Sequence, residues 1–315
     1  MTPIRLLLNS GFSGANAFLA IALQQGLFRD AQLDLRCTPG RGAYTAAQRL
    51  VPEGFDAAYG DLNALIELAA TEPAQDLPVA VLLVHPRAPS TITVARDGPV
   101  RGAADLAGRS VVGHASDVAL RTFPVYARTA GLAPGAVALR TSDAVMAKLL
   151  ADMLQGASDG VFGYMTTHTA ALAGIGRDAA TCVRFLPYRD VCPDLMGSAL
   201  MVAPPLARDQ PQVVAALVRV VLAGIELART YPAAALDAVI ACNPAADRAI
   251  EGERWRGTLH GDMAEAPGGH GLGGGVDEAR LSRAIASMAL AFGWAQAPAA
   301  ARVFTPAFLP RERAA

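Results

Sequence analysis

The stretch Gly54-Phe55-Asp56-Ala57-Ala58-Tyr59-Gly60 is matched further along the chain by Gly156-Ala157-Ser158-Asp159-Gly160-Val161-Phe162-Gly163. In both stretches a glycine ends an amphipathic helix and an aspartate opens a four-residue strand. A second glycine then turns the chain into another helix. Any helix–strand–helix unit shares part of this pattern, so the local match alone leaves repetition and coincidence open. The sequence on either side of the two stretches decides between them.

Around the first stretch, short apolar strands alternate with amphipathic helices. We expect strands over residues 4–8, 33–37, 56–59 and 79–84, with helices in the segments between them. Residues 79–84 form an unbroken apolar run, as expected for a strand that is covered on both faces. Strands separated by helices at this spacing predict a mostly parallel, doubly wound sheet, and therefore an α/β fold.

A proline-rich break at residues 86–99 interrupts this alternation, which then restarts. We expect an extended segment over 90–95, a helix over 117–130, and strands at 110–113, 137–140, 159–162 and 182–186. The restart favours two similar open sheets, one in each of two lobes. After Val202 the chain becomes helical, and we expect these helices to cover the first sheet. The predicted lobes are residues 1–88 with 203–315, and residues 89–202.

The composition excludes several classes of protein. The formal net charge of -1 lacks the basic excess of a nucleic-acid binder, and a chain that is 52% hydrophobic is not disordered. Residues 6–28 are uncharged after Arg5, as in a signal peptide, but Asn9-Ser10-Gly11 interrupts the apolar run. We therefore expect no export signal in the chain as given. Residues 161–176 and 284–301 are too short or too polar for membrane helices.

Groups that carry catalysis are scattered. Lys148, the only lysine, precedes Asp152 by four residues, a spacing typical of a solvated helical ion pair. The histidines lack metal-binding spacing, and no GxSxG motif of a serine hydrolase occurs. The four cysteines form no CxxC pair and suit buried apolar positions, although a Cys182–Cys192 disulfide stays open. We expect no enzymatic activity, no cofactor and no metal.

Ligands of open α/β sheets bind beyond the carboxyl ends of the strands, near helix N-termini. This rule predicts binding residues in both lobes without any alignment. The predicted set is Asn9, Ser10, Phe12, Arg41, Gly42, Tyr44, Tyr59, Asp61, His85, His114, Ser116, Asp117, Tyr164, Tyr188 and Asp190.

Each of these residues also has a purely structural interpretation. Asp61 and Asp117 are equally suited to cap helices, and Asn9 and Ser10 to form a turn. Only 6% of the chain is aromatic, yet four of its tyrosines fall near predicted strand ends. They favour a flat heteroaromatic ligand held by stacking. An anion such as a sulfonate would need arginine, and only Arg41 is available in the set.

The assembled layout resembles bacterial extracytoplasmic solute-binding proteins of the branch that binds thiamine pyrimidine precursors and alkanesulfonates. The resemblance covers nearly the whole chain. It is carried by QQGLFRDAQLDL at residues 24–35, PGRGAYTAAQRLVPEGFDAAYGDLNAL at 39–65, DLAGRSV at 105–111, YRD at 188–190, MGSAL at 196–200, GVD at 275–277 and FTPAFLP at 304–310. Each piece is weak singly, but their order and spacing make the set moderately specific.

The resemblance implies a type II periplasmic-binding-protein fold, in which two crossover segments join the lobes and act as a hinge. These segments map near residues 84–91 and 197–203. The resemblance also implies a periplasmic or otherwise extracytoplasmic receptor, expected to be a monomer, that delivers a small-molecule ligand to the membrane subunits of an ABC importer.

Two other functions compare differently with these features. A ligand-sensing module would carry the same sequence features. A related fold synthesises the thiamine pyrimidine with lysine-bound pyridoxal phosphate, a histidine and a cysteine-rich iron site, but this chain has no cysteine cluster.

Overall fold

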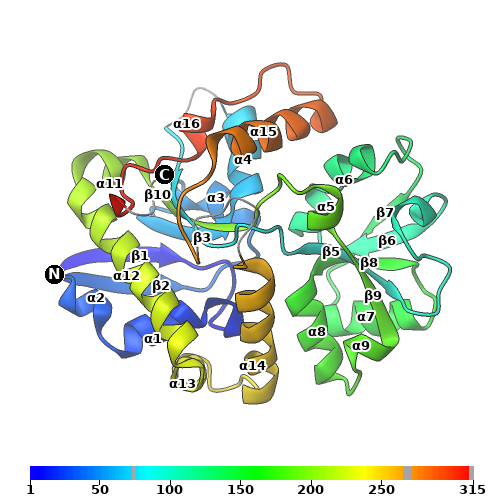
Figure 1. Ribbon diagram of the computed structural model, residues 1–315, viewed down its shortest axis with the longest axis horizontal. Coiled ribbons are helices and arrows are strands. Elements are labelled where there is room, and N and C mark those ends of the chain that lie inside the picture. Colours follow the sequence, from blue (N-terminus) through cyan, green and yellow to red (C-terminus); the bar gives the residue numbers. More distant parts are fainter. Residues whose placement is uncertain (73–75, 265–271, 312–315) are drawn as a thin grey trace.

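The computed structural model describes residues 1–72, 76–264 and 272–311. These residues form two lobes side by side, each built on a five-stranded sheet with helices on its faces (Figure 1). Both sheets and their flanking helices confirm the predicted α/β class.

The first sheet has the strand order β2-β1-β3-β10-β4. β1 pairs in parallel with β2 and β3, whereas β10 runs antiparallel to both β3 and β4. The strands are β1 (Thr2–Leu7), β2 (Leu33–Thr38), β3 (Ala57–Asp61), β4 (Val79–Leu83) and β10 (Ser198–Val202).

The second sheet repeats this plan in the order β7-β6-β8-β5-β9. β6 pairs in parallel with β7 and β8, and the antiparallel strand β5 lies between β8 and β9. The strands are β5 (Ser90–Ala95), β6 (Ser110–Gly113), β7 (Ala138–Thr141), β8 (Gly160–Tyr164) and β9 (Val183–Pro187). In each sheet the antiparallel strand is the one that arrives from the other lobe.

Helices connect the strands and cover the sheets. In the first lobe they are η1 (Gly14–Asn16), α1 (Ala17–Gln24), α2 (Leu27–Asp30), α3 (Thr45–Leu50) and α4 (Leu62–Thr71). In the second they are η2 (Ala103–Leu106), α5 (Val118–Arg121), α6 (Phe123–Thr129), α7 (Met146–Leu154), α8 (Met165–Gly174), α9 (Ala179–Cys182) and α10 (Tyr188–Val191). After β10 come α11 (Pro204–Asp209), α12 (Pro211–Thr230), α13 (Pro232–Cys242), α14 (Arg248–Gly257), the π-helical turn η3 (Thr258–Asp262), α15 (Glu278–Phe292) and α16 (Ala300–Val303).

The aspartates of the two repeated stretches make the same type of hydrogen bond to a neighbouring strand. The Asp56 side chain accepts a hydrogen bond from the backbone N–H of Arg5 on β1, at 2.7 Å. The Asp159 side chain accepts one from the backbone N–H of Ser110 on β6, at 2.8 Å. Each aspartate thus ties the start of the central strand of its sheet, β3 or β8, to the neighbouring strand. The helix–Gly–Asp–strand pattern is a structural repeat.

The boundary between the lobes differs from the predicted one at residue 202. β10 pairs along its whole length with β3 and β4, so residues 198–202 belong to the first lobe. The sequence of β10 resembles that of any buried strand, and only its hydrogen bonds reveal which sheet it joins. The crossovers are therefore residues 84–89 and 192–197.

Of the C-terminal helices, α12, α13 and α16 pack on the first lobe, as expected, whereas α14 and α15 also contact α8 and α6 of the second lobe. α12 packs against α1, where Gly224 lies so close that a Cβ there would be 2.5 Å from the Phe18 carbonyl oxygen. Among the described residues α12 is the one helix that is long and apolar enough to span a membrane by length and composition. Half of its apolar stretch is buried within the lobe. The helix therefore fits its position as a core helix of this lobe.

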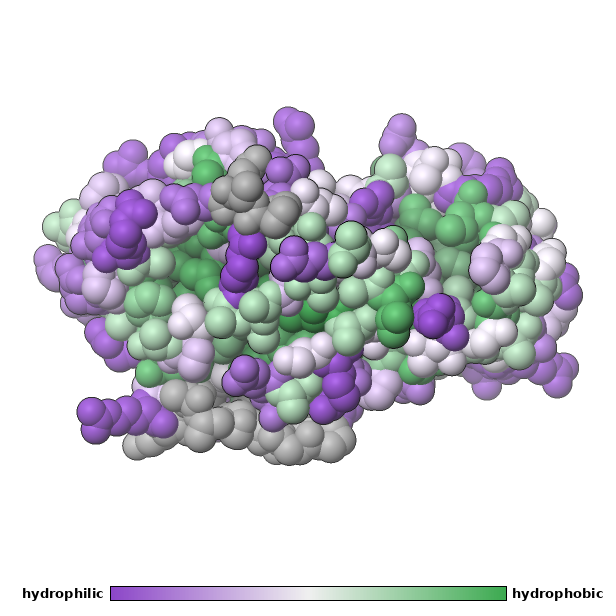
Figure 2. Space-filling model, turned by 90° about the horizontal axis from the view of Figure 1, so that it is seen from above, coloured by the Kyte–Doolittle hydropathy of each residue, from purple (hydrophilic) through white to green (hydrophobic). Residues whose placement is uncertain are grey.

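The outer surface is mixed in character. Hydrophilic side chains project from the rims of both lobes, and apolar surface gathers over the lobe at the right when the molecule is seen from above (Figure 2). α14 lies beside the boundary between the lobes (Figure 1), in contact with η1 of the first lobe and α8 of the second.

Candidate ligand-binding site

A cavity of about 350 Å³ lies between the lobes, at the carboxyl ends of strands from both sheets. This is the size range of a small-molecule site. Eight of the predicted binding residues line it: Asn9, Ser10, Arg41, Gly42, His114, Ser116, Asp117 and Tyr164. Five further residues complete the lining: Ala43, Val118, Met146, Gly163 and Thr167.

Two loops of the first lobe form one wall. The Asn9 carbonyl, just after β1, accepts a hydrogen bond from the Gly42 N–H at 2.8 Å. Gly42 has a φ of 106°, a conformation that L side chains rarely adopt. At Gly40 a Cβ would lie 1.9 Å from the Leu8 carbonyl oxygen, so this close approach also requires glycine. The two glycines bring the loop that carries Arg41 beside Asn9 and Ser10.

The opposite wall comes from the second lobe. Asp117 caps α5, because its Oδ1 accepts a hydrogen bond from the Ala119 N–H at 2.8 Å. Burial raises the pKa of this carboxyl to about 6. The helix-cap interpretation of Asp117 is therefore correct, and the residue also lines the cavity. Ser116 lies across from Gly42, with its Oγ 3.5 Å from the position of a Cβ on that glycine.

A hydrogen bond between the lobes closes one side of the cavity. The Tyr164 hydroxyl, at the end of β8, donates to Asp61 Oδ2 on β3 at 3.2 Å. Asp61 is fully buried and caps α4 by accepting from the Asn63 N–H at 2.9 Å. Burial raises its pKa to about 6. Asp61 thus lies behind Tyr164 and does not line the cavity itself.

The prediction that several tyrosines surround the ligand requires correction. Tyr59 is 1% exposed, and its hydroxyl is 3.1 Å from His85 Nε2. His85 is buried as well, and this burial lowers its pKa to about 3, so the ring is neutral. Tyr188 is fully buried, donates to the Ala119 carbonyl at 2.6 Å, and packs on Tyr126 with ring centroids 4.5 Å apart. Tyr59 lies inside β3, all five residues of which are buried, whereas Tyr188 begins α10, which packs against α6.

Three more predicted residues lie outside the cavity. Tyr44 is 8% exposed, and its hydroxyl accepts a hydrogen bond from the Arg121 guanidinium at 3.0 Å. Phe12 is half-buried against the core, and its carbonyl accepts from Asn243. Asp190 is exposed on α10. Tyr164 is therefore the one predicted tyrosine in the cavity wall.

Met146 and Thr167 are lining residues that the sequence prediction missed. Thr167 follows Tyr164 by three residues at the start of α8, so both face the same side of the chain. The three-residue spacing from Tyr164 was the sequence feature that could have predicted Thr167 as a lining residue. Met146 begins α7, and nothing in its sequence context distinguishes it from a core residue.

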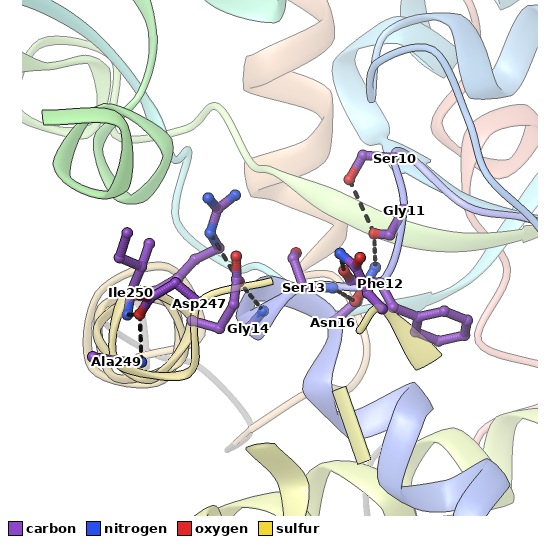
Figure 3. A network of polar contacts seen from close by, with 12 residues as sticks. Ser10, Gly11, Phe12, Ser13, Gly14, Asn16, Asp247, Ala249 and Ile250 are labelled. Atoms are coloured by element: carbon purple, nitrogen blue, oxygen red, sulfur yellow. Dashed lines mark hydrogen bonds and ion pairs between the residues drawn. The ribbon is translucent and has the colours of Figure 1, made fainter. Parts of the chain in front are cut away.

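The loop that follows Ser10 is held by polar contacts of Ser13, Gly14 and Asn16 (Figure 3). Asn16 Oδ1 accepts from the Ser13 N–H at 2.9 Å, and its amide donates to the Gly11 carbonyl at 3.2 Å. Glu251 of α14 accepts from the Gly14 N–H at 2.6 Å. The C-terminal part of the chain therefore positions a loop of the cavity.

Two other hollows are less suited to a polar solute. One of about 980 Å³ lies among α12, α13 and α14, and one of about 420 Å³ lies between α6 and α15. The arginines of the larger hollow are paired, for example Arg248 with Asp237 and Arg256 with Glu253. Neither hollow combines loops at strand ends from both sheets.

The described part of the chain contains no group of three or more His, Cys, Asp or Glu residues placed to hold a metal ion. All four cysteines are free, and burial raises the pKa of the Cys37 thiol to about 12. Lys148 pairs with Asp152 at 2.8 Å, as its spacing predicted. Neither Lys148 nor a cysteine lines the cavity.

The fold and the cavity between its lobes define a class, the proteins with the periplasmic-binding-protein fold. The periplasmic aliphatic sulphonate binding protein SsuA from Escherichia coli is similar, with a TM-score of 0.73, 15% identity, and coverage of 98% of this chain and 100% of that one. The alkanesulfonate-binding protein SsuA from Xanthomonas axonopodis pv. citri, bound to MOPS, has a TM-score of 0.69, 16% identity and 98% coverage of both chains.

A ligand-binding component of an ABC-type import system from Staphylococcus aureus, with zinc bound, has a TM-score of 0.67 and 11% identity, with both chains covered completely. At these identities the likeness shows the fold. The chain belongs to the NMT1/THI5-like family, whose model matches residues 15–235. No curated protein sequence matches it.

Proposed function

We propose that this protein is a solute-binding receptor that captures a small molecule in the cavity between its lobes. One observation carries the proposal: loops at strand ends of both sheets contribute side chains to a single cavity of about 350 Å³. A ligand that touches both lobes stabilises their closed arrangement, because it binds that arrangement more tightly than an open one.

The ligand class that the cavity favours is a small organic anion such as a sulfonate. Arg41 supplies a positive charge, and the side chains of Asn9, Ser10, Ser116 and Thr167 supply hydrogen-bond donors. Val118 and Met146 offer apolar surface for a short carbon chain. The names of the Escherichia coli and Xanthomonas relatives agree with this class.

A pyrimidine related to thiamine precursors is the second candidate, and Tyr164 is the observation that favours it. Among the lining residues its phenol ring and the His114 imidazole are the aromatic surfaces, and Asp117 lies in the same cavity to accept from an amino group. Tyr59 and Tyr188 are buried, so they cannot stack on a ligand ring from two sides. We therefore rank a pyrimidine below a sulfonate as the candidate ligand.

The partner in this proposal is the membrane part of an ABC importer, and the receptor is extracytoplasmic. The Staphylococcus aureus relative is named as a component of such a system, and the Escherichia coli relative as periplasmic. In this role the receptor binds and releases its solute unchanged, as a monomer and without catalysis.

A thermal-shift screen followed by calorimetry tests the function. Alkanesulfonates, pyrimidines, thiamine fragments and amino acids are each added to the purified chain, and one class is expected to raise Tm, since binding to the folded state stabilises it. Arg41→Ala is expected to weaken sulfonate binding about tenfold or more, through loss of a charge-assisted hydrogen bond.

Arg36→Ala is the matched control, because Arg36 is exposed on β2 and pairs with Asp34. It is expected to bind like the wild type. Stabilisation by pyrimidines alone would favour the second candidate. Turnover of a tested compound, with no stabilisation by any class, would contradict the receptor function.

A further inference from the structure

Arg121, at the end of α5 in the second lobe, reaches into the first lobe. Its Nη2 donates to Glu67 Oε1 on α4 at 2.7 Å and to the Tyr44 hydroxyl at 3.0 Å. The guanidinium also lies over the Tyr44 ring, 4.9 Å from its centroid. These three interactions join lobes that the backbone connects only through two crossovers. We call Arg121, Glu67 and Tyr44 the latch.

The environment strengthens the latch. The Glu67 side chain is 15% exposed, and its Oε2 is buried without a hydrogen-bond partner, so the carboxylate depends on Arg121 for compensation. The Arg121 side chain is 44% exposed, which keeps the desolvation cost of its charge small. Burial, followed by the neighbouring Glu67 carboxylate, raises the pKa of Tyr44, so its hydroxyl stays protonated.

A small apolar cluster beside the latch also spans the two lobes. Ala43, Tyr44 and Ala64 of the first lobe pack against Val118 of the second, with Tyr164 at the edge of the cluster. Val118 precedes Arg121 by one helical turn, and Ala43 lines the cavity next to Tyr44. The latch therefore lies directly behind the cavity wall, although none of its three residues is among the lining residues.

We propose that the latch favours the closed arrangement of the lobes without help from a solute. It thereby sets the affinity of the receptor from outside the cavity. The proposal rests on the receptor function for its link to affinity. For a protein whose binding-competent state is only partly populated, the apparent dissociation constant equals the intrinsic one divided by the populated fraction. A stronger latch thus means tighter binding with no change in the contacts to the solute.

The distance between spin labels on the two lobes tests the latch without any solute. One label is placed on Cys242, which is exposed on α13 of the first lobe, and one on Lys148→Cys, on α7 of the second. Cys37 and Cys182 are replaced by alanine in every sample, and Cys192 is buried.

Arg121→Ala is expected to shift the distance distribution toward an open arrangement. The ratio of closed to open molecules should fall about tenfold, equivalent to about 1.4 kcal/mol. Tyr44→Phe removes one hydroxyl and should shift the ratio less. Arg121→Glu should open the lobes further, and adding Glu67→Arg should recover part of the closed population by restoring the ion pair in reverse. A purely structural role of Arg121 would not show this recovery.

Arg229→Ala is the matched control, because it breaks an Arg–Glu pair within α12 of one lobe, with Glu226. Its distance distribution should equal that of the wild type, and all variants are checked by thermal unfolding. Equal label-to-label distance distributions for wild type, Arg121→Ala and Arg121→Glu would overturn the latch proposal. A wild type with no closed population would overturn it as well. The spin-label experiment uses no solute, so it is independent of the ligand screen. If no ligand class binds but Arg121→Ala still opens the lobes, the receptor function is refuted and the latch proposal stands.

Discussion

Asp262 is a buried carboxylate with little compensation. It is 3% exposed, and the charge nearest to it is Arg189 Nη1 at 3.9 Å. Burial raises its pKa to about 7. The folded protein therefore holds this proton more tightly than the unfolded chain, in which an aspartate titrates near pH 4. The stability that this residue contributes falls as the pH rises from about 4 to 7, and ionised Asp262 destabilises the fold above pH 7.

Asp262→Asn is accordingly expected to stabilise the protein at pH 8, by at least about 1 kcal/mol, and to lose this advantage as the pH falls toward 4. Urea unfolding at several pH values measures the difference. Asp237→Asn, at an exposed position on α13, serves as the control and should show no such trend. A constant difference between Asp262→Asn and the wild type across this range would contradict the raised pKa.

At the residue scale, the sequence predicted which loops meet better than which side chains do so. Arg41, His114 and Ser116 follow strands, and all three line the cavity. Tyr59 was expected at a strand end, but β3 continues to Asp61 and all five of its residues are buried, so Tyr59 packs edge-on against Phe18. The chain alone did not show where this strand ends, so proximity to a strand end predicted the wrong environment for Tyr59.

At the scale of elements, the contact between α12 and α1 depends on Gly224. Helix propensity favours alanine over glycine by about 1 kcal/mol, yet a Cβ at this position would meet the Phe18 carbonyl oxygen at 2.5 Å. We expect Gly224→Ala to destabilise the protein by about 1–2 kcal/mol, because overpacking outweighs propensity. Denaturant unfolding checks this. Gly102→Ala, where a Cβ meets nothing within 4 Å, should be neutral, and a stabilised Gly224→Ala would refute the close approach.

α14 supports the loop between β1 and η1 through one buried carboxylate. Glu251 is 7% exposed and accepts from the Gly14 N–H. Glu251→Ala should destabilise the protein by about 1–3 kcal/mol, since it leaves that N–H unpaired. Hydrogen exchange at the Gly14 amide should accelerate by more than the global loss explains. Glu251→Gln keeps an acceptor and should exchange nearly as slowly as the wild type. Slow exchange in Glu251→Ala would show that another group holds the loop.

The elements themselves were largely predictable, and their interruptions were less so. Residues 117–130 were expected to form one helix, but the structure divides them into α5 and α6. Pro124 lies in the first turn of α6 and has no N–H to continue the hydrogen bonding of α5. The local sequence contained this signal, whereas the apolar periodicity across it pointed to a continuous helix.

For the whole molecule, the second lobe is a continuous insertion between β4 and β10. All five strands of its sheet fall within residues 90–187, whereas the first sheet needs β10 from beyond the insertion. We propose residues 89–197 as an independently folding unit. This fragment is expected to unfold cooperatively, as followed by circular dichroism. A fragment of residues 1–188 lacks β10 and therefore cannot complete the first sheet, so its first lobe is expected not to unfold cooperatively. A disordered 89–197 fragment would show that the second lobe needs the core it shares with the first.

The amino-acid sequence by itself determined the repeated helix–Gly–Asp–strand unit, the alternation of strands and helices, and the loops at strand ends that carry Arg41, His114 and Tyr164. These features are local, since they follow from spacing, turn residues and apolar periodicity. The tertiary structure alone decided that β10 belongs to the first sheet, that Tyr59 and Tyr188 are buried, and that Arg121 reaches Glu67. Each of these depends on pairing between segments far apart in the chain, and residue spacing carries no information about such pairing.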